Sequence, residues 1–413
     1  MSVSDPLIKD IKGHTLRLFH ETTVKDSSEN LEKFCHVIEA IFHKGLIEKH
    51  NFYSKKIEVF AWMSTISSGD DLIDFIYKNS VQEVQKCKSV TTPVGKFRLL
   101  IRHCLVNKCL HFPLEALNKS DKKPFIYEKN SIIGDEILST IFSSVLLQCK
   151  KINFQLDLSN YYFLDLTWGI PDRVKLELVP CQSLGVNISF SENRAVVVHI
   201  RPNSVASESG EISIGDILAN LNGVEITSSC KGRLNTILRL SKGRPINLII
   251  IKASHNGDIF APIKTLLRDL KLDTNHEKTA QNEPKTGFKA TYLGCVNVGC
   301  KGSVRQIEEV LKFHLNKFEI GDRKPVSIEI GEINVKITHL ETNQILLKHS
   351  FMQISSCGSA QNSPNYVAYI AGDENCDTAN NFVCYIFHVN DVSLAYTILQ
   401  SIGQGFHRTH FAV

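Results

Sequence analysis

The spacing of apolar residues changes close to residue 168, and this change constrains the fold more than any other feature of the sequence. Before it, apolar residues recur three and four positions apart, as from Phe34 to Phe42, and so share one face of a helix. After it, the apolar runs are short and rich in valine and isoleucine, as from Val196 to Ile200. One uniform architecture is therefore excluded. We predict an all-α helical bundle over residues 1–170, followed by strand-rich structure.

The strand-rich part begins with a compact section, residues 174–253. Turn signals at Asn222-Gly223 and Lys242-Gly243 separate its apolar runs, and one helix-like piece spans 234–240. This order predicts a β-rich domain with one or two helices. Residues 254–286 then hold a short amphipathic piece and the polar run DTNHEKTAQNEPKTG, which has too little apolar area to order itself. We predict a linker there.

Residues 287–413 mix both periods again. A helical pattern over 302–318 precedes alternating apolar runs over 326–337, a strand-like run over 382–389 and a helical stripe over 393–406. A sheet closed by a C-terminal helix, an α+β domain, is the arrangement that this order predicts. The length agrees with several domains, because 413 residues exceed what one hydrophobic core usually serves.

Charge and cysteine content exclude several classes of function. The net charge of +4 is too close to neutral to indicate a nucleic-acid partner. The sequence shows no signal peptide and no apolar run of about 18 residues, so we expect a cytoplasmic protein that reaches membranes only through its partners. The 12 cysteines lie mostly in apolar periodic runs, where reduced thiols behave as small core residues.

The sequence also lacks the motifs of common enzymes: it has no GxSxG elbow, Walker loop, HExxH or CxxC pair. Cys295 with Cys300, and His407 with His410, have spacings that could be drawn as metal ligands, but zinc sites usually show two pairs at short spacing. We therefore predict a protein without catalytic residues, metal or cofactor.

Three blocks of the helical part follow one another in a characteristic order: LEKFCHVIEAIFHKGL, TPVGKFRLLIRHCLVNKCL and YEKNSIIGDEILSTIFSSVLLQCKKINFQLDL. Together they resemble a RUN domain. The tryptophan that follows the Tyr-Glu pair in that family is missing, because Asn130 or Ser131 stands in its place. The resemblance implies a helical bundle whose partners are small GTPases or motor proteins.

The second of these blocks carries four cations, Lys96, Arg98, Arg102 and Lys108, on the side opposite its apolar stripe. Two interpretations are open. The cations can form an ordinary solvated face, or they can form a docking surface that steers an acidic partner such as a GTPase.

The compact section at 174–253 contains a loop, Ser183-Leu184-Gly185-Val186, and the run GEISIGDIL followed by Asn-Gly. These motifs resemble the carboxylate-binding loop and the Gly-Asp motif of PDZ domains. Successive N–H groups of such a loop can bind a terminal carboxylate, and the strand through Asn187 and Ile188 offers an edge for an added peptide strand. The alternative is a PDZ-like fold that only spaces its neighbours.

The last section contains FKATYLGC at 288–295, HSFMQISSC at 349–357 and IGQGF at 402–406. It resembles a phosphotyrosine-binding (PTB) domain of the Disabled-like kind, with the PH superfold. The resemblance implies that an Asn-Pro-x-Tyr peptide adds to the fifth strand and lies against the closing helix. The groove residues expected from it are Gln353, Ile354, Ser355, Ser356, Cys357, Ile402 and Phe406. Phe406 can equally be a core residue.

A phosphotyrosine pocket favours arginine, yet the stretch from 345 to 358 has only Lys348 and His349 as basic residues. We therefore expect little effect of ligand phosphorylation. The chain end, Phe411-Ala-Val413, also resembles a ligand for an apolar PDZ groove, and it can either occupy this chain's own groove or stay on the PTB-like domain.

The combined prediction is a non-catalytic cytoplasmic adaptor. It would link peptide tails of membrane receptors or cargo, through the PTB-like and PDZ-like sections, to a small GTPase or motor in trafficking or signalling. The alternatives are a signalling scaffold with degenerate grooves and a regulator of a small GTPase.

Overall fold

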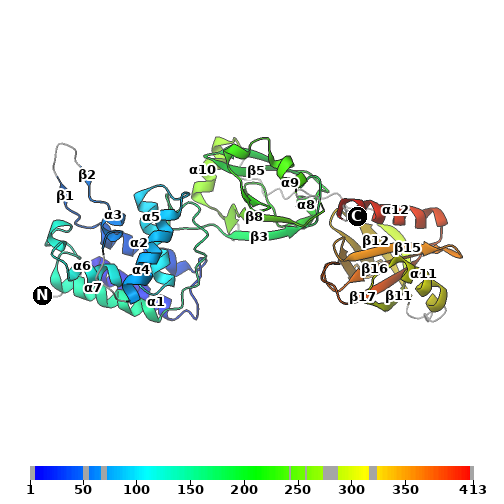
Figure 1. The fold of residues 1–413 in the computed structure, drawn as a ribbon, viewed down its shortest axis with the longest axis horizontal. Coiled ribbons are helices and arrows are strands. Elements are labelled where there is room, and N and C mark those ends of the chain that lie inside the picture. The colour runs from blue at the N-terminus through cyan, green and yellow to red at the C-terminus, as the bar shows by residue number, and fades with distance from the viewer. Residues whose placement is uncertain are drawn as a thin grey trace. The chain divides into compact units, whose positions relative to one another are not determined.

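The structure is a computed structural model, and it describes residues 5–49, 55–66, 72–240, 243–255, 258–272, 287–315 and 323–409. The chain divides into two compact units, Met1–Asp172 and Arg173–Val413. The first is helical, and the second contains two separate main sheets with their helices (Figure 1).

The first unit confirms the predicted all-α bundle. Phe42 lies at its centre, where its ring meets the edges of Phe97 and Phe142 at centroid distances of 5.7 Å. Two short strands, β1 (Glu48–Lys49) and β2 (Lys55–Lys56), form a small antiparallel pair, and two 3-10 turns span Lys123–Phe125 and Cys149–Lys151. The helices are α1 (Pro6–Phe19), α2 (Glu29–His43), α3 (Val59–Met63), α4 (Leu72–Lys86), α5 (Pro93–Val106), α6 (Phe112–Asn118) and α7 (Glu136–Gln148).

Side chains next to the helix starts explain where several of these helices begin. Asp5 accepts a hydrogen bond from the amide of Leu7 at 2.9 Å, and Thr92 accepts one from Gly95 at 2.9 Å. Asp135 does the same for Leu138 at 2.8 Å, at the start of α7. Each of these bonds satisfies a helix amide that has no partner within its own helix.

The second unit begins with the first of its two main sheets. The strand order is β3-β8-β6-β5-β4, with β7 paired to β6, so β4 forms one edge. The strands are β3 (Arg173–Leu178), β4 (Val186–Ser191), β5 (Arg194–Ile200), β6 (Ile217–Leu221), β7 (Val224–Glu225) and β8 (Ile246–Ile251). The helical elements are α8 (Val205–Ser209), the 3-10 turn Ser228–Cys230 and α9 (Leu234–Leu240).

The predicted linker is wrong in its first half. Residues up to 272 form two short strands, β9 (Ser254–His255) and β10 (Asp258–Ile259), and the helix α10 (Ala261–Asp269). The helix buries Ile263, Leu266 and Leu267, and a Cβ added at Gly215 would lie 3.5 Å from Leu267. The amphipathic piece therefore packs on the turn before β6. The polar run that motivated the linker prediction lies outside the described residues, except for its last residue, Gly287.

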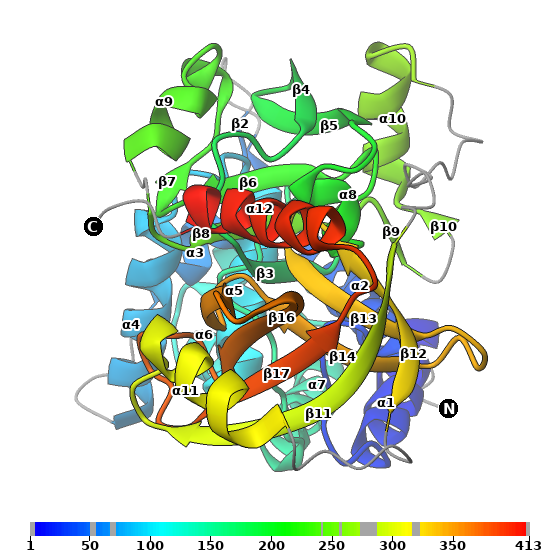
Figure 2. The ribbon, with the colours of Figure 1, turned by 90° about the vertical axis from the view of Figure 1, so that its right-hand side faces the viewer.

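The last part of the chain forms the second main sheet, with strand order β14-β13-β12-β11-β17-β16-β15. Its edges are therefore β14 and β15. The strands are β11 (Phe288–Gly299), β12 (Lys324–Ile330), β13 (Asn334–His339), β14 (Ile345–Ser350), β15 (Ile354–Ala360), β16 (Ser363–Gly372) and β17 (Phe382–His388). Two helices, α11 (Val304–His314) and α12 (Val392–Thr409), pack against β15 and β16 (Figure 2). This is the predicted α+β arrangement closed by a C-terminal helix.

Candidate peptide-binding edges and the buried arginines

The strand β15 is the first candidate peptide site. Within the described residues it pairs only with β16, so its other backbone edge is open to an added strand. Its start is firmly held, because the hydroxyl groups of Ser355 and Ser356 both donate to the carbonyl of Gly302 at 2.8 Å. These two serines therefore position the strand. Cys357 is half-buried, and burial raises the pKa of its thiol to about 11.

Two residues predicted to line this groove lie in the core instead. Ile354 is 0% exposed and Ile402 is 1% exposed, and both belong to the hydrophobic core under α12. The helical stripe in the sequence did not distinguish core from groove positions. Gln353 closes the turn before β15, because its side-chain oxygen accepts a hydrogen bond from the amide of Ser350 at 3.0 Å.

Phe406 is the predicted groove residue that keeps part of its surface. Its ring lies 6.5 Å from the ring of Phe351 in an edge-on arrangement, and it is only half-buried. Gly405 makes this approach possible, since a Cβ there would overlap the Phe351 ring. Phe406 therefore packs on a buried phenylalanine and also offers apolar surface.

Sequence reasoning missed the outward apolar stripe of α12. Val392 and Tyr396 are 48% and 69% exposed, and Leu399 is half-buried. Together with Phe406 they recur four, three and seven positions apart, which places them on one helix face. This spacing could have indicated the exposed stripe in the sequence, but the buried stripe of α12, which includes Ile398 and Ile402, has the same helical period and is more apolar.

The two basic residues of the stretch 345–358 offer little for a phosphate. Lys348 is exposed, but His349 donates or accepts a hydrogen bond with the Tyr369 hydroxyl at 3.0 Å and its ring lies 4.7 Å from that of Tyr385. Burial lowers the pKa of His349, so the ring is held neutral. Only one cation of the stretch therefore faces solvent.

The second candidate site is the loop before β4. Gly185 has a φ of +80°, and a Cβ there would overlap the Cβ of Ser204, so the position requires glycine. The carbonyls of Leu184 and Gly185 accept hydrogen bonds from Ala206 and Arg201 at 2.9 and 2.8 Å. The amide of Gly185 donates to the Ser183 hydroxyl at 3.3 Å. The loop is thus fixed through its carbonyls.

The strand β4 pairs only with β5 among the described residues, so it too presents an open edge. Val186 and Ile188 are half-buried and pack on the core, whereas Asn187 is exposed. The first residue of α9, Leu234, packs on the same core and is also half-buried. The edge strand β4 and the start of α9 thus pack on the same hydrophobic core, and both keep part of their apolar surface exposed.

The predicted basic face of α5 is wrong. Arg98 and Arg102 are 8% and 3% exposed, and both form buried ion pairs. Lys96 is half-buried, and Lys108 lies beyond the end of the helix. The four cations therefore do not share a solvent-exposed surface.

The Arg98 ion pair lies in a dense polar cluster. The guanidinium donates to both carboxylate oxygens of Glu39 at 2.9 and 3.0 Å and to the Leu164 carbonyl at 2.9 Å. It also lies 5.7 Å from the ring centre of Trp168, whose indole N–H donates to Glu39. Burial disfavours ionised Glu39, but the bonds from Arg98 and Trp168 outweigh it, so the pKa of Glu39 is lowered.

Arg102 is held in the same way. It donates to a carboxylate oxygen of Asp26 at 2.6 Å and to the carbonyl of Asp157 at 2.9 Å, while the second oxygen of Asp26 accepts from the Asp157 amide. Both arginines thus tie α5 to segments far away in the sequence.

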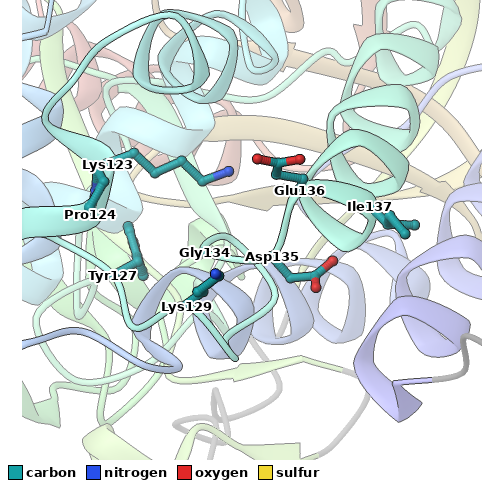
Figure 3. A pocket seen from close by; sticks show the side chains of 8 residues that line it. All are labelled: Lys123, Pro124, Tyr127, Lys129, Gly134, Asp135, Glu136 and Ile137. Carbon is teal, nitrogen blue, oxygen red and sulfur yellow. The ribbon is translucent and has the colours of Figure 1, made fainter.

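A pocket of about 660 Å³ in the first unit was not predicted. It lies around the start of α7, and Figure 3 shows the ammonium group of Lys123 extending toward the carboxylate of Glu136. Burial lowers the pKa of Lys123, although Glu136 and Asp135 oppose that shift. The lining residues are Lys123, Pro124, Tyr127, Lys129, Gly134, Asp135, Glu136 and Ile137.

Comparison with protein families identifies three domains in the predicted order. The RUN domain model matches residues 33–160, the PDZ domain model residues 173–251 and the phosphotyrosine interaction domain (PTB/PID) model residues 288–412. The three suspected modules are thereby confirmed, and each matches the fold described for its part of the chain.

No curated protein matches the sequence. Among solved structures, the chain is similar to the C-terminal phosphotyrosine interaction domain of mouse APBB2 in its solution structure. The identity is 14%, the match covers 32% of this chain and 95% of that chain, and the TM-score is 0.25.

The three domains are interaction modules, which supports a protein-interaction adaptor or scaffold and is consistent with a non-enzyme. Within the described residues, no helix is both long and apolar enough to cross a bilayer. The same part of the chain contains no group of three or more His, Cys, Asp or Glu side chains that could hold a metal. His407 and His410 lie outside the described side chains.

Proposed function

We propose that the chain is a non-catalytic cytoplasmic adaptor that holds two peptide tails and connects them to a small GTPase or motor. The observation that carries this proposal is the presence of two open sheet edges, β4 and β15, each belonging to a domain of a peptide-binding family. The 12 free thiols support a reducing compartment such as the cytoplasm.

At β15 the proposed ligand is an Asn-Pro-x-Tyr peptide from the tail of a membrane receptor or cargo protein. The peptide would extend the sheet and place apolar side chains against the exposed part of Phe406. The experiment is a titration of the full-length chain with such a peptide. Phe406→Ala should weaken binding about tenfold or more, because it removes aromatic burial on the order of 1 to 3 kcal/mol.

The matched control is Phe313→Ala on α11, since Phe313 is 62% exposed and removes a ring of equal size. Circular dichroism shows whether both variants remain folded. Equal affinity of the folded Phe406→Ala variant and the control would contradict the β15 site. Phosphorylating the peptide tyrosine should change the affinity less than tenfold, because Lys348 is the one exposed cation of the described stretch 345–358.

At β4 the proposed ligand is a C-terminal peptide with a free carboxylate and an apolar residue two positions before its end. The carboxylate would meet the amides of the Leu184–Val186 loop, and the apolar side chain would meet Leu234. An amidated copy of the same peptide is the direct control. Equal binding of the acid and amide forms would show that the loop does not bind carboxylate.

The GTPase link is proposed from the RUN domain alone, and the buried arginines cannot supply its surface. Ile137 and Phe125, which are 62% and 69% exposed next to the pocket at α7, are the better candidates. Ile137→Glu should weaken GTPase binding, whereas Leu16→Glu on α1, at an equally exposed position of 61%, should not. Faster GTP hydrolysis or exchange on addition of the chain would favour a regulator instead.

A signalling scaffold with degenerate grooves remains the second candidate, because Ser183 and Val186 replace the residues typical of the PDZ loop. Such a scaffold would capture partners through domain surfaces, independently of both sheet edges. Capture by the full-length chain that is insensitive to Phe406→Ala and to peptide amidation would favour it.

A further inference from the structure

The short helix α8 lies directly behind the loop before β4. Ser204, which precedes it, packs against Gly185, and the amide of Ala206 donates to the Leu184 carbonyl at 2.9 Å. Ser204, Val205 and Ala206 are 3%, 2% and 0% exposed. The start of α8 is therefore part of the framework that fixes the candidate carboxylate loop.

The other end of α8 reaches the PTB domain. One carboxylate oxygen of Glu208 accepts hydrogen bonds from the backbone amides of Glu332 at 2.7 Å and Ile333 at 3.0 Å. These two residues form the turn between β12 and β13, which is closed by a bond of 2.8 Å from the Gly331 amide to the Asn334 carbonyl. Amides at such a turn ordinarily face water, and bonds to a carboxylate are stronger than bonds between neutral groups.

Two further features make this contact specific. Gly331 leaves room for the carboxylate, because a Cβ there would lie 2.6 Å from the same Glu208 oxygen. Ile333 and Met352 place apolar side chains against the hydrophobic core of the PDZ domain. The contact therefore combines charge-assisted hydrogen bonds with apolar packing, as interfaces of defined geometry do.

The turn at 331–333 is also connected to the candidate groove at β15. The carbonyl of Ile333 accepts a hydrogen bond from the amide of Phe351 at 2.9 Å. The ring of Phe351 supports Phe406, and the following residue Met352 lies two positions before β15. A continuous set of contacts thus runs from the carboxylate loop through α8 and the turn to Phe406.

We propose that Glu208 and the 331–333 turn form a fixed joint between the PDZ and PTB domains, and that this joint couples their two peptide sites. A ligand in the carboxylate loop would further restrict the residual motion of α8 and of the turn, so a second ligand at β15 would lose less conformational entropy on binding. Coupling must be reciprocal, with each peptide raising the affinity for the other by the same factor. The coupling rests on the proposed function, whereas the joint does not.

The joint is tested without any ligand by amide hydrogen exchange on the full-length chain. The amides of Glu332 and Ile333 should be protected in the wild-type protein and should exchange about tenfold faster or more in Glu208→Ala. Gly331→Ala, made on the other side of the contact, should have the same effect. Glu211→Ala is the matched control, because it removes an exposed acid three residues from Glu208.

The coupling is tested by titrating the same proteins with the Asn-Pro-x-Tyr peptide, in the presence and absence of saturating C-terminal peptide. The wild-type chain and Glu211→Ala should bind about threefold to tenfold more tightly in its presence. Glu208→Ala and Gly331→Ala should bind each peptide alone normally but lose this enhancement.

Fast exchange of the two amides in the wild-type chain, or protection that Glu208→Ala leaves intact, would overturn the joint. A coupling factor of one in the wild-type chain, or one unchanged by both variants, would overturn the coupling. Failure of either peptide to bind the wild-type chain would contradict the proposed function, and the exchange experiment would still decide the joint.

Discussion

Replacing Arg98 by methionine should strongly destabilise the RUN domain. The change removes both bonds to Glu39, the bond to the Leu164 carbonyl and the contact with Trp168. It leaves the Glu39 carboxylate, whose side chain is only 19% exposed, without its cation. Breaking a buried pair on one side in this way costs about 3 to 5 kcal/mol.

The assay is urea unfolding followed by tryptophan fluorescence. The chain has two tryptophans, Trp62 and Trp168, and both lie in the first unit, so the signal reports that unit alone. With a denaturant dependence of about 2 kcal/mol per molar urea, the midpoint should fall by about 1.5 to 2.5 M. Lys33→Ala should leave it unchanged, because Lys33 pairs with Glu29 on the surface.

A double variant separates two causes of the lost stability: the unpaired charge of Glu39 and the lost contacts of the Arg98 side chain. Glu39→Gln combined with Arg98→Met should be more stable than Arg98→Met alone, because no buried charge remains and the new amide oxygen would still offer Trp168 an acceptor. A loss below about 1 kcal/mol for the single variant, or a double variant as unstable as the single one, would refute the reasoning. The lowered pKa of Glu39 adds a pH test: its stabilisation is present above its ordinary value of 4.5 and is lost as the pH falls below it.

Three further predictions concern the second unit. Gly185→Ala should abolish binding of a C-terminal peptide and lower the melting temperature, because the new Cβ meets Ser204 and the φ of +80° is strained; unchanged peptide affinity would contradict this. Since burial lowers the pKa of His349 below 6.5, stability should fall as the pH drops through that value, and His349→Asn should flatten the dependence measured by urea unfolding with circular dichroism. Leu267→Ala should cost about 2 to 5 kcal/mol in the same assay if α10 belongs to the PDZ domain, and no measurable loss if it is a tether.

The families and the open strand edges could be predicted from the sequence because they depend on local motifs and on spacing. The burial of Arg98 and Arg102 could not. Helical spacing shows which residues share a face, but not which distant segment covers it, and the partners here are Glu39, Asp26 and a carbonyl near residue 164. A charged pair four positions apart is therefore as compatible with a buried network as with a docking surface.

The same reason explains the errors in the PTB domain. Ile402 and Phe406 are four positions apart and lie on the same side of α12, and only the packed structure shows that the first is core and the second is partly exposed. The joint through Glu208 has no sequence signature at all, because its acceptor is one carboxylate and its donors are backbone amides. Backbone donors leave no residue type by which they can be recognised.

The position of α10 sets where this chain can be cut or recombined. The PDZ family pattern ends at residue 251, but α10 buries Ile263, Leu266 and Leu267, and Leu267 packs next to Gly215. A gene rearrangement or an expression fragment that stopped at the pattern boundary would carry an unsealed hydrophobic surface and would tend to aggregate. The folded domain is therefore longer than its family pattern. A graft of this domain onto another protein should include the chain through residue 272.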